Sequence, residues 1–179
     1  MLNLTQVSLI NYPGKVAATL FFPGCNFRCG YCHNPDLVNS KKINNKDYFS
    51  LYLSFVEKKK PYISGVCMTG GEPLLNDSLV FKLAKRFKEM GLLVKLDTNG
   101  YFPKYLDKLL KFKLVDYIAM DIKSSQKNYS KVVGHKIDIS KIIESVEIIK
   151  SSGVNYEFRS TVIPGLYCKD EAFFICKWL

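Results

Sequence analysis

The chain has 179 residues, of which 47% are hydrophobic and 23% charged, a composition typical of a soluble globular protein of one domain. The longest apolar runs, such as VAATLFF at residues 16–22, are far too short to cross a membrane, and the N-terminus lacks a basic segment followed by an apolar one, so we expect a cytoplasmic protein. The formal net charge of +10 comes almost wholly from scattered lysines, which argues against nucleic-acid binding and suits attraction to an acidic protein partner.

Short apolar segments rich in β-branched and aromatic residues alternate with helical patterns along the chain. The segments that predict strands are residues 16–22, 66–69, 93–97, 117–122 and 156–163. Apolar residues at helical spacing predict helices over residues 77–90 and 141–152, each followed by a glycine, and another helix begins near Lys169. This alternation predicts an α/β fold in which helices cover a parallel sheet, either an open sheet or a barrel.

Polar residues that a hydrophobic core does not need accompany the end of each predicted strand. The first strand leads into PGCNFRC, the next three lead into TGGEP, DTNG and DIK, and Arg159 lies within the fifth. Parallel α/β enzymes build their sites at the carboxyl ends of the strands. Five such segments in succession therefore predict one shared site at that end of the sheet.

The stretch CNFRCGYCHNP, from Cys25 to Pro35, allows three interpretations. Cys29, Cys32 and His33 match the C-x-x-C-H pattern of c-type haem attachment, but this leaves Cys25 without a role. His33 and the three cysteines form a Cys3His zinc set, although adjacent residues rarely bind the same tetrahedral ion. Three thiolates alone suit a four-iron cluster, which normally takes four, and then leave one iron open to a substrate.

The remaining cysteines and the second histidine show no comparable pattern. Cys67, Cys168 and Cys176 lie far apart in sequence, and we expect them to be small buried hydrophobic residues. His135 lies in the polar segment VVGHK, and we expect it at the surface rather than in a catalytic role.

The C-x3-C-x2-C motif, with an aromatic residue before its last cysteine and TGGEP further along, resembles the radical S-adenosylmethionine (SAM) superfamily. The segments CNFRCGYCHNP, MTGGEPLL, VKLDTNGYFP, DYIAMDIK and YEFRSTVIPG resemble the activating enzymes of glycyl-radical enzymes over nearly the whole chain, most closely those of anaerobic ribonucleoside-triphosphate reductases. The resemblance implies a single radical SAM domain over residues 1–179 with a partial (β/α)6 TIM-barrel fold. Because only five strands are predicted, we expect a shortened member or a chain that lacks the last strand.

The same resemblance implies roles for individual residues. A [4Fe-4S] cluster would be held by Cys25, Cys29 and Cys32, and its open iron would bind the amino and carboxylate groups of SAM. The expected SAM contacts are Tyr31 near the adenine, Gly70 and Gly71 where backbone approaches the ligand, Glu72 near the methionine ammonium, Asn99, and Lys123 and Arg159 near the carboxylate or ribose. A monovalent cation beside the SAM carboxylate would be held by Asp97, Thr98 and Asp121, although DTNG also forms a turn unaided.

The implied reaction needs no general acid or base, and so no catalytic residue beyond the cluster ligands. An electron donor such as flavodoxin or ferredoxin reduces the cluster, and SAM is cleaved to methionine and a 5′-deoxyadenosyl radical, which takes a hydrogen atom from a glycine of the partner enzyme. The implied partner is anaerobic ribonucleotide reductase. The alternatives are a pyruvate formate-lyase-type activating enzyme, a small-molecule enzyme like 7-carboxy-7-deazaguanine synthase, and, from another class, a non-catalytic iron–sulfur electron carrier.

Overall fold

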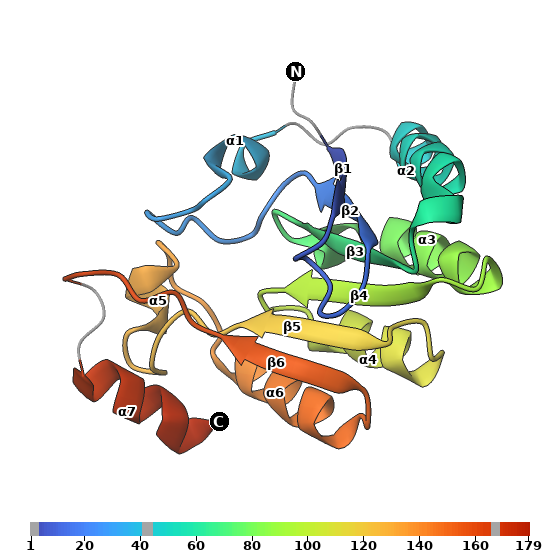
Figure 1. The fold of residues 1–179 in the computed structure, drawn as a ribbon. Helices are drawn as coiled ribbons and strands as arrows, with labels where there is room; N and C mark the ends of the chain where they lie inside the picture. Colours follow the sequence, from blue (N-terminus) through green and yellow to red (C-terminus); the bar gives the residue numbers. More distant parts are fainter. Residues whose placement is uncertain (1–3, 41–44, 166–168) are drawn as a thin grey trace.

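In the computed structural model, which describes residues 4–40, 45–165 and 169–179, six strands form one sheet in the order β1-β2-β3-β4-β5-β6 (Figure 1). The strands are β1 (Thr5–Ser8), β2 (Ala17–Phe22), β3 (Gly65–Gly70), β4 (Leu93–Thr98), β5 (Tyr117–Asp121) and β6 (Asn155–Arg159). Strands β2 to β6 are parallel, and each lies beside the next strand in the chain. This order is that of a (β/α) barrel rather than of a doubly wound sheet, which confirms the predicted fold class.

The sequence analysis predicted the five parallel strands but not the sixth strand of the sheet, β1. Strand β1 pairs antiparallel with β2, at the opposite edge of the sheet from β6. Its four residues, TQVS, expose Gln6 and Val7, so the strand carries no alternating apolar pattern that would reveal it. Beyond β6, the described residues contain helix α7 (Lys169–Trp178) and no further strand.

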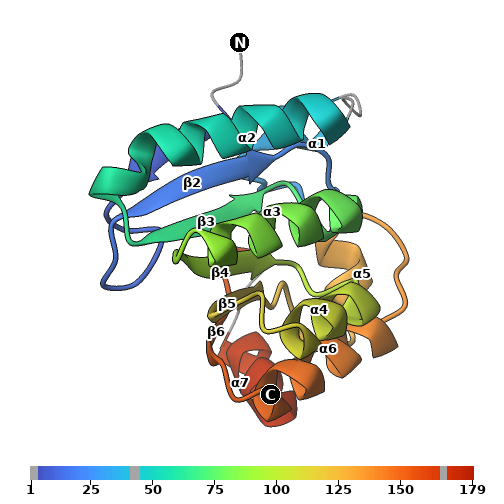
Figure 2. The same cartoon turned by 90° about the vertical axis from the view of Figure 1, so that its right-hand side faces the viewer.

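Four helices cover one face of the sheet, as Figure 2 shows for α2 (Asn45–Lys59), α3 (Asp77–Glu89), α4 (Pro103–Lys111) and α6 (Ser140–Ser151). The two helices predicted in full are confirmed to within one residue at each end. In α3 the apolar stripe is buried, and the chain leaves the helix through Gly91 at a φ of 76°, a conformation that glycine adopts without strain. The remaining helices, α1 (Pro35–Val38), α5 (Tyr129–Val132) and α7, lie toward the carboxyl ends of the strands (Figure 1).

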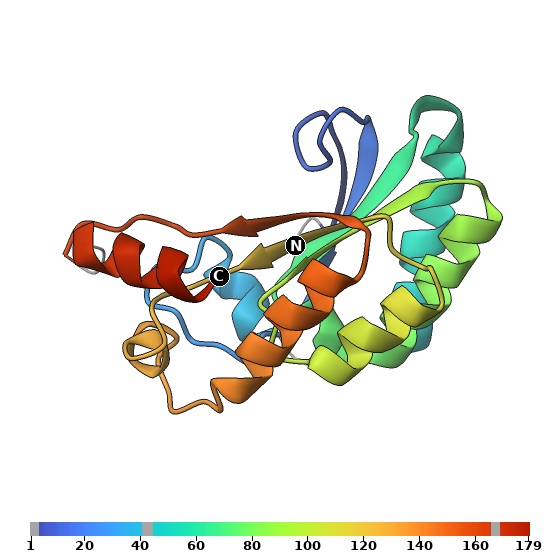
Figure 3. The same cartoon turned by 90° about the horizontal axis from the view of Figure 1, so that it is seen from below.

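The sheet is curved, with the helices on its outer side (Figure 3), and its two faces differ in the side chains they carry. Alternate strand residues such as Leu20, Met68, Leu96 and Ile118 are fully buried in the core beneath the helices. The opposite, concave face carries polar side chains, among them a lysine, Lys95, that is only 2% exposed. The apolar face therefore stabilises the sheet, whereas the concave face supplies the polar side chains that a functional site needs.

The cysteines outside the motif and His135 differ in how far they are exposed. Cys67 is buried as predicted, but Cys176 is exposed on α7, so that prediction was wrong, and Cys168 lies outside the described residues. Cys176 lies on a short helix in which Phe173 and Phe174 are also exposed. His135 is exposed, as expected. Within the described ranges, no helix has the length and apolar character required to span a membrane.

Candidate functional site

A cavity of about 300 Å³ opens at the carboxyl ends of the parallel strands. Of the thirteen residues predicted for the site, the twelve that line this cavity are Cys25, Cys29, Tyr31, Cys32, Gly70, Gly71, Asp97, Thr98, Asn99, Asp121, Lys123 and Arg159. These residues come from the loop after β2 and from the ends of β3, β4, β5 and β6. The structure thus brings together segments that are more than 130 residues apart in sequence.

The cysteine loop is fixed to the rest of the fold by its backbone. Gly24 N–H donates to the carbonyl of Leu37 at 2.7 Å, and Arg28 N–H donates to the carbonyl of Val133 at 2.8 Å. The side chain of Phe27 is 2% exposed and packs between the cysteines against the core. The loop therefore has a defined position even though its residues form neither helix nor strand.

The three thiols of this loop face the cavity without meeting at one point. Among the described residues, no three Cys, His, Asp or Glu side chains surround a single ion position, whereas ligands of a cluster each bind a different iron. Burial raises the pKa of Cys25 to about 11, and it also raises the pKa of Cys29. These thiols therefore need the positive charge of a metal to lose their protons at neutral pH.

Gly70 and Gly71 bring the end of β3 against the cysteine loop. Gly70 has a φ of 116°, and a Cβ there would lie 2.7 Å from the carbonyl oxygen of Phe22. A Cβ on Gly71 would lie 2.8 Å from the carbonyl carbon of Gly24 and closer still to its oxygen. Both glycines line the cavity, where the resemblance implies that backbone approaches a ligand. Their absent side chains, however, make room for the backbone next to Cys25.

Glu72 is the thirteenth predicted residue, expected near the methionine ammonium of SAM. Its side chain is fully buried and is not part of the cavity wall. The carboxylate accepts hydrogen bonds from Leu74 N–H at 3.0 Å, from the Thr98 hydroxyl at 2.9 Å and from Asn99 N–H at 2.7 Å. Burial raises the pKa of Glu72 to about 7, and these donors oppose the rise. Glu72 thus joins the ends of β3 and β4.

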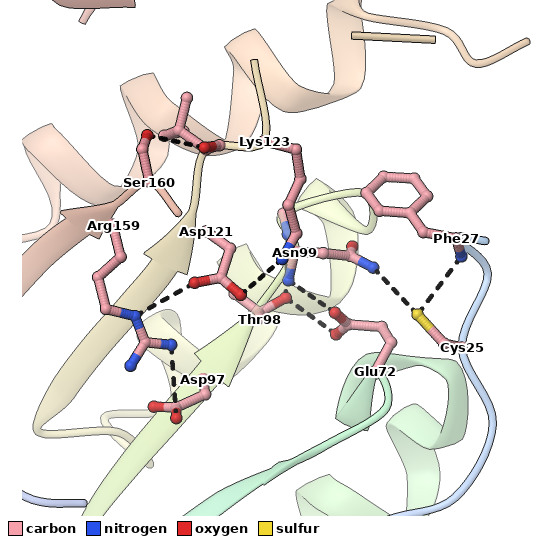
Figure 4. Close-up of polar contacts among 12 residues, drawn as sticks. Cys25, Phe27, Glu72, Asp97, Thr98, Asn99, Asp121, Lys123, Arg159 and Ser160 are labelled. Carbon is pink, nitrogen blue, oxygen red and sulfur yellow. Dashed lines mark hydrogen bonds and ion pairs between the residues drawn. The ribbon is translucent and has the colours of Figure 1, made fainter. Parts of the chain in front are cut away.

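Asp97 and Asp121 converge as predicted, and Arg159 lies between them (Figure 4). The guanidinium is 3.2 Å from a carboxylate oxygen of Asp121 and 3.5 Å from one of Asp97. The ammonium of Lys123 is 2.9 Å from the other oxygen of Asp121. Burial, the largest single effect, lowers the pKa of Lys123, but the charge and hydrogen bond of Asp121, together with smaller contributions from Cys29 and Tyr31, leave that pKa raised. Both cations stay charged beside the cavity.

Two further charged residues extend this network on the concave face, and the sequence analysis missed both. The buried Lys95 ammonium contacts Asp97 and lies 4.0 Å from a carboxylate oxygen of Glu157. Glu157 in turn is 3.8 Å from the guanidinium of Arg159. Lys95 precedes Asp97 by two residues, and Glu157 precedes Arg159 by two. The period of two along a strand was therefore the signal that could have placed them on the same face.

Tyr31 supplies a further indication that the cavity accepts a ligand. Within the described part of the chain, its buried hydroxyl has no hydrogen-bond partner. An unpaired buried hydroxyl costs about 1–3 kcal/mol, and Tyr31 lines the cavity beside the cysteines. A polar group bound there would remove this cost.

Comparison with known proteins gives consistent results. The family model described as the radical SAM superfamily matches residues 19–172. A Methanocaldococcus jannaschii protein named provisionally as a glycyl-radical enzyme activating enzyme is 32% identical over 98% of this chain and 73% of its own length. The pyruvate formate-lyase-activating enzyme of Clostridium pasteurianum is 31% identical over 92% of this chain and 68% of its own. For the pyruvate formate-lyase 1-activating enzyme of Escherichia coli K12 the values are 27%, 85% and 63%.

Solved structures share the fold at low sequence identity. Native anSMEcpe with bound AdoMet superposes with a TM-score of 0.60 at 21% identity, covering 79% of this chain and 42% of that one. QueE from Escherichia coli superposes with a TM-score of 0.53 at 12% identity, covering 89% and 83%. These similarities concern the arrangement of the helices and strands.

Proposed function

The chain belongs to the radical SAM superfamily and, within it, to the activating enzymes of glycyl-radical enzymes, and we propose that it uses SAM and a [4Fe-4S] cluster to generate a glycyl radical on a partner enzyme. The observation that carries this proposal is the single cavity that collects the three motif cysteines and the polar ends of four parallel strands. The chain spans 63% to 73% of the length of the curated relatives described above. The proposed activity is therefore supported by the residues of this cavity as well as by membership of the family.

The residues of the cysteine loop fit a cluster of this kind. Cys25, Cys29 and Cys32 supply three thiols to one cavity, and three thiolates leave the fourth iron of a four-iron cluster open. When bound and reduced, such a cluster supplies a low-potential electron that cleaves SAM and so yields a radical able to abstract a hydrogen atom from glycine. The protein contributes the fixed loop, the partly buried thiols and the cavity that they line.

The rest of the cavity wall fits SAM, which is charged at both its sulfonium and its amino acid end. Lys123 and Arg159 carry positive charges beside the cavity, and we propose that they bind the carboxylate or the ribose hydroxyls. The unpaired hydroxyl of Tyr31 is assigned to the adenosine end. The cavity wall also contains Gly70, Gly71, Thr98 and Asn99, and we propose that they contact SAM through short side chains or backbone.

We also propose that a monovalent cation binds between Asp97 and Asp121. Asp97 and Asp121 were expected to hold it, but in this structure both carboxylates contact the guanidinium of Arg159. A cation between them would therefore have to displace Arg159, which would then be free to turn toward the SAM carboxylate. SAM binding should in that case become tighter as the potassium or sodium concentration rises.

We propose anaerobic ribonucleoside-triphosphate reductase as the partner, on the basis of the motifs CNFRCGYCHNP and VKLDTNGYFP, and flavodoxin or ferredoxin as the electron donor. A second candidate partner is a pyruvate formate-lyase, which the names of two of the relatives favour. Both candidates are glycyl-radical enzymes, so the chemistry required of the cavity is the same.

The test is to reconstitute the full chain with iron and sulfide under anaerobic conditions, reduce it, add SAM and measure 5′-deoxyadenosine. We expect release by the wild-type chain and none by Cys29→Ala. An electron carrier would release none in either case, which would refute the proposed chemistry. Incubation with each candidate partner then identifies the substrate, because only the true partner should develop a glycyl-radical electron paramagnetic resonance signal.

A further inference from the structure

Through its backbone N–H and its side-chain amide, Asn99 connects the buried carboxylate of Glu72 to the cysteine loop (Figure 4). Its backbone N–H donates to Glu72 at 2.7 Å. Its side-chain Nδ2 donates to the Sγ of Cys25 at 3.9 Å and to the Oδ1 of Asn26 at 2.8 Å. The residue is itself only 5% exposed. One asparagine therefore links the ends of β3 and β4 to the first thiol of the C-x3-C-x2-C motif.

The orientation of this amide follows from its neighbours. The Oδ1 of Asn99 accepts a hydrogen bond from the backbone N–H of Tyr101 at 3.0 Å. An amide oxygen can only accept and an amide nitrogen can only donate, so the nitrogen has to face Cys25 and Asn26. The backbone N–H of Phe27 also donates to the Cys25 sulfur, at 3.4 Å. This sulfur thus has two N–H donors that come from different segments of the fold.

We propose that Asn99 is a positioning residue that directs an N–H donor at the Cys25 ligand and thereby raises the reduction potential of the cluster, while Glu72 holds Asn99 in place. The inference rests on the proposed function, because it concerns the cluster that Cys25 would bind. Reduction adds negative charge to a cluster, and part of that charge lies on its sulfur ligands. Hydrogen bonds to these sulfurs stabilise the reduced form more than the oxidised form, which raises the potential.

Glu72 suits this supporting role better than a role in contact with a ligand. It is fully buried, and its three hydrogen bonds all go to groups within the loops that end β3 and β4. A carboxylate that binds a backbone N–H fixes the main chain of Asn99, and so fixes the direction of its side chain. The glutamate of the TGGEP segment thus acts on the cluster through a second residue.

The test compares Asn99→Ser with Asn128→Ser. A serine hydroxyl at 99 can still accept from Tyr101 N–H, but both hydrogen bonds from the Asn99 amide nitrogen to the cysteine loop, to Cys25 and to Asn26, are lost. Asn128 is the matched control, because its amide donates at 2.9 Å to a different carboxylate, that of Glu171. The midpoint potential of the reconstituted cluster is measured by redox titration in full-length protein. We expect the reduction equilibrium to shift about tenfold against the reduced form in Asn99→Ser, or about 59 mV for one electron, and no shift in Asn128→Ser.

The outcomes separate this inference from the proposed function. If Asn99→Ser keeps the wild-type potential while SAM still changes the spectrum of its cluster, the inference fails and the proposed function stands. If the wild-type chain holds no SAM-responsive cluster, both fail.

Two further measurements cover a defect in assembly. If Asn99→Ser takes up no cluster, Asn99→Asp is titrated instead, since it keeps the shape and the acceptor for Tyr101 but turns the donor into an acceptor. An unchanged potential in Asn99→Asp overturns the inference. So does a melting temperature of the metal-free protein that falls much further in Asn99→Ser than in Asn128→Ser, because the role of Asn99 would then be general stability.

Discussion

Replacing Gly71 with alanine should destabilise the fold and disturb the cysteine loop together. The new Cβ would lie 2.8 Å from the carbonyl carbon of Gly24 and 3.2 Å from the carbonyl oxygen of Phe22. These are backbone atoms, which cannot turn aside as a flexible side chain does. The carbonyl of Gly24 also accepts the N–H of Glu72 at 2.8 Å, so moving it apart breaks that hydrogen bond as well.

The magnitude follows from these two effects. Forcing a methyl group into a filled space costs about 1–3 kcal/mol, and the lost hydrogen bond costs about 1 kcal/mol. A total of about 2–4 kcal/mol lowers the melting temperature of a chain this size by about 5–15 °C. Because Gly24 directly precedes Cys25, we also expect less iron to be retained after reconstitution.

Gly30→Ala is the matched control, since it lies in the same loop with no atom within 4 Å of the new Cβ. It should change the free energy of unfolding by less than about 0.5 kcal/mol. Thermal unfolding of the metal-free proteins, followed by circular dichroism under reducing conditions, gives the comparison. If Gly71→Ala melts together with Gly30→Ala, the close contact between β3 and the cysteine loop is not present in the molecule.

Three further predictions concern single side chains. Cys29→Ala should abolish both the cluster and SAM cleavage, whereas Cys67→Ala, at a buried site outside the cavity wall, should retain both; equal effects in iron content and product assays would contradict the assignment. Burial raises the pKa of Glu72 from 4.5 to about 7, so the folded chain binds a proton more tightly than the unfolded chain, and stability should fall by about 3 kcal/mol as the pH rises between these values. Urea unfolding at several pH values should show this loss in the wild type and not in Glu72→Gln, and identical profiles would mean that Glu72 titrates normally. Arg159→Gln should weaken SAM binding by about tenfold, measured by calorimetry, while Arg86→Gln, which breaks only an exposed pair on α3, should leave the affinity unchanged; a loss of affinity in both would point to net charge instead of the site.

The parallel part of the fold could be predicted because local pattern and tertiary structure agree there. In β3, β4 and β5 a short apolar run is buried beneath helices whose stripes are equally clear in the sequence. Strand β1 was missed because an edge strand of four residues gains its stability from pairing with β2 and from little burial of its own. Such pairing through backbone hydrogen bonds does not require a particular pattern of residues in the strand.

The members of the site could be predicted better than their contacts. The carboxyl ends of parallel strands must meet at one edge, so twelve of the thirteen residues share one cavity. Which way Glu72 points depends on donors at positions 98 and 99, and these become its neighbours only in the folded chain. Lys95 was passed over because a lysine within a strand suggests an exposed face, whereas the carboxylates of Asp97 and Glu157 allow it to be buried.

The most direct test of the account is the electron paramagnetic resonance spectrum of the reduced, reconstituted chain recorded with and without SAM. We expect about four irons per chain and a spectrum that changes when SAM is added, because the ligand binds the iron that Cys25, Cys29 and Cys32 leave open. A chain that contains only zinc, or a cluster whose spectrum stays the same with SAM, would contradict it.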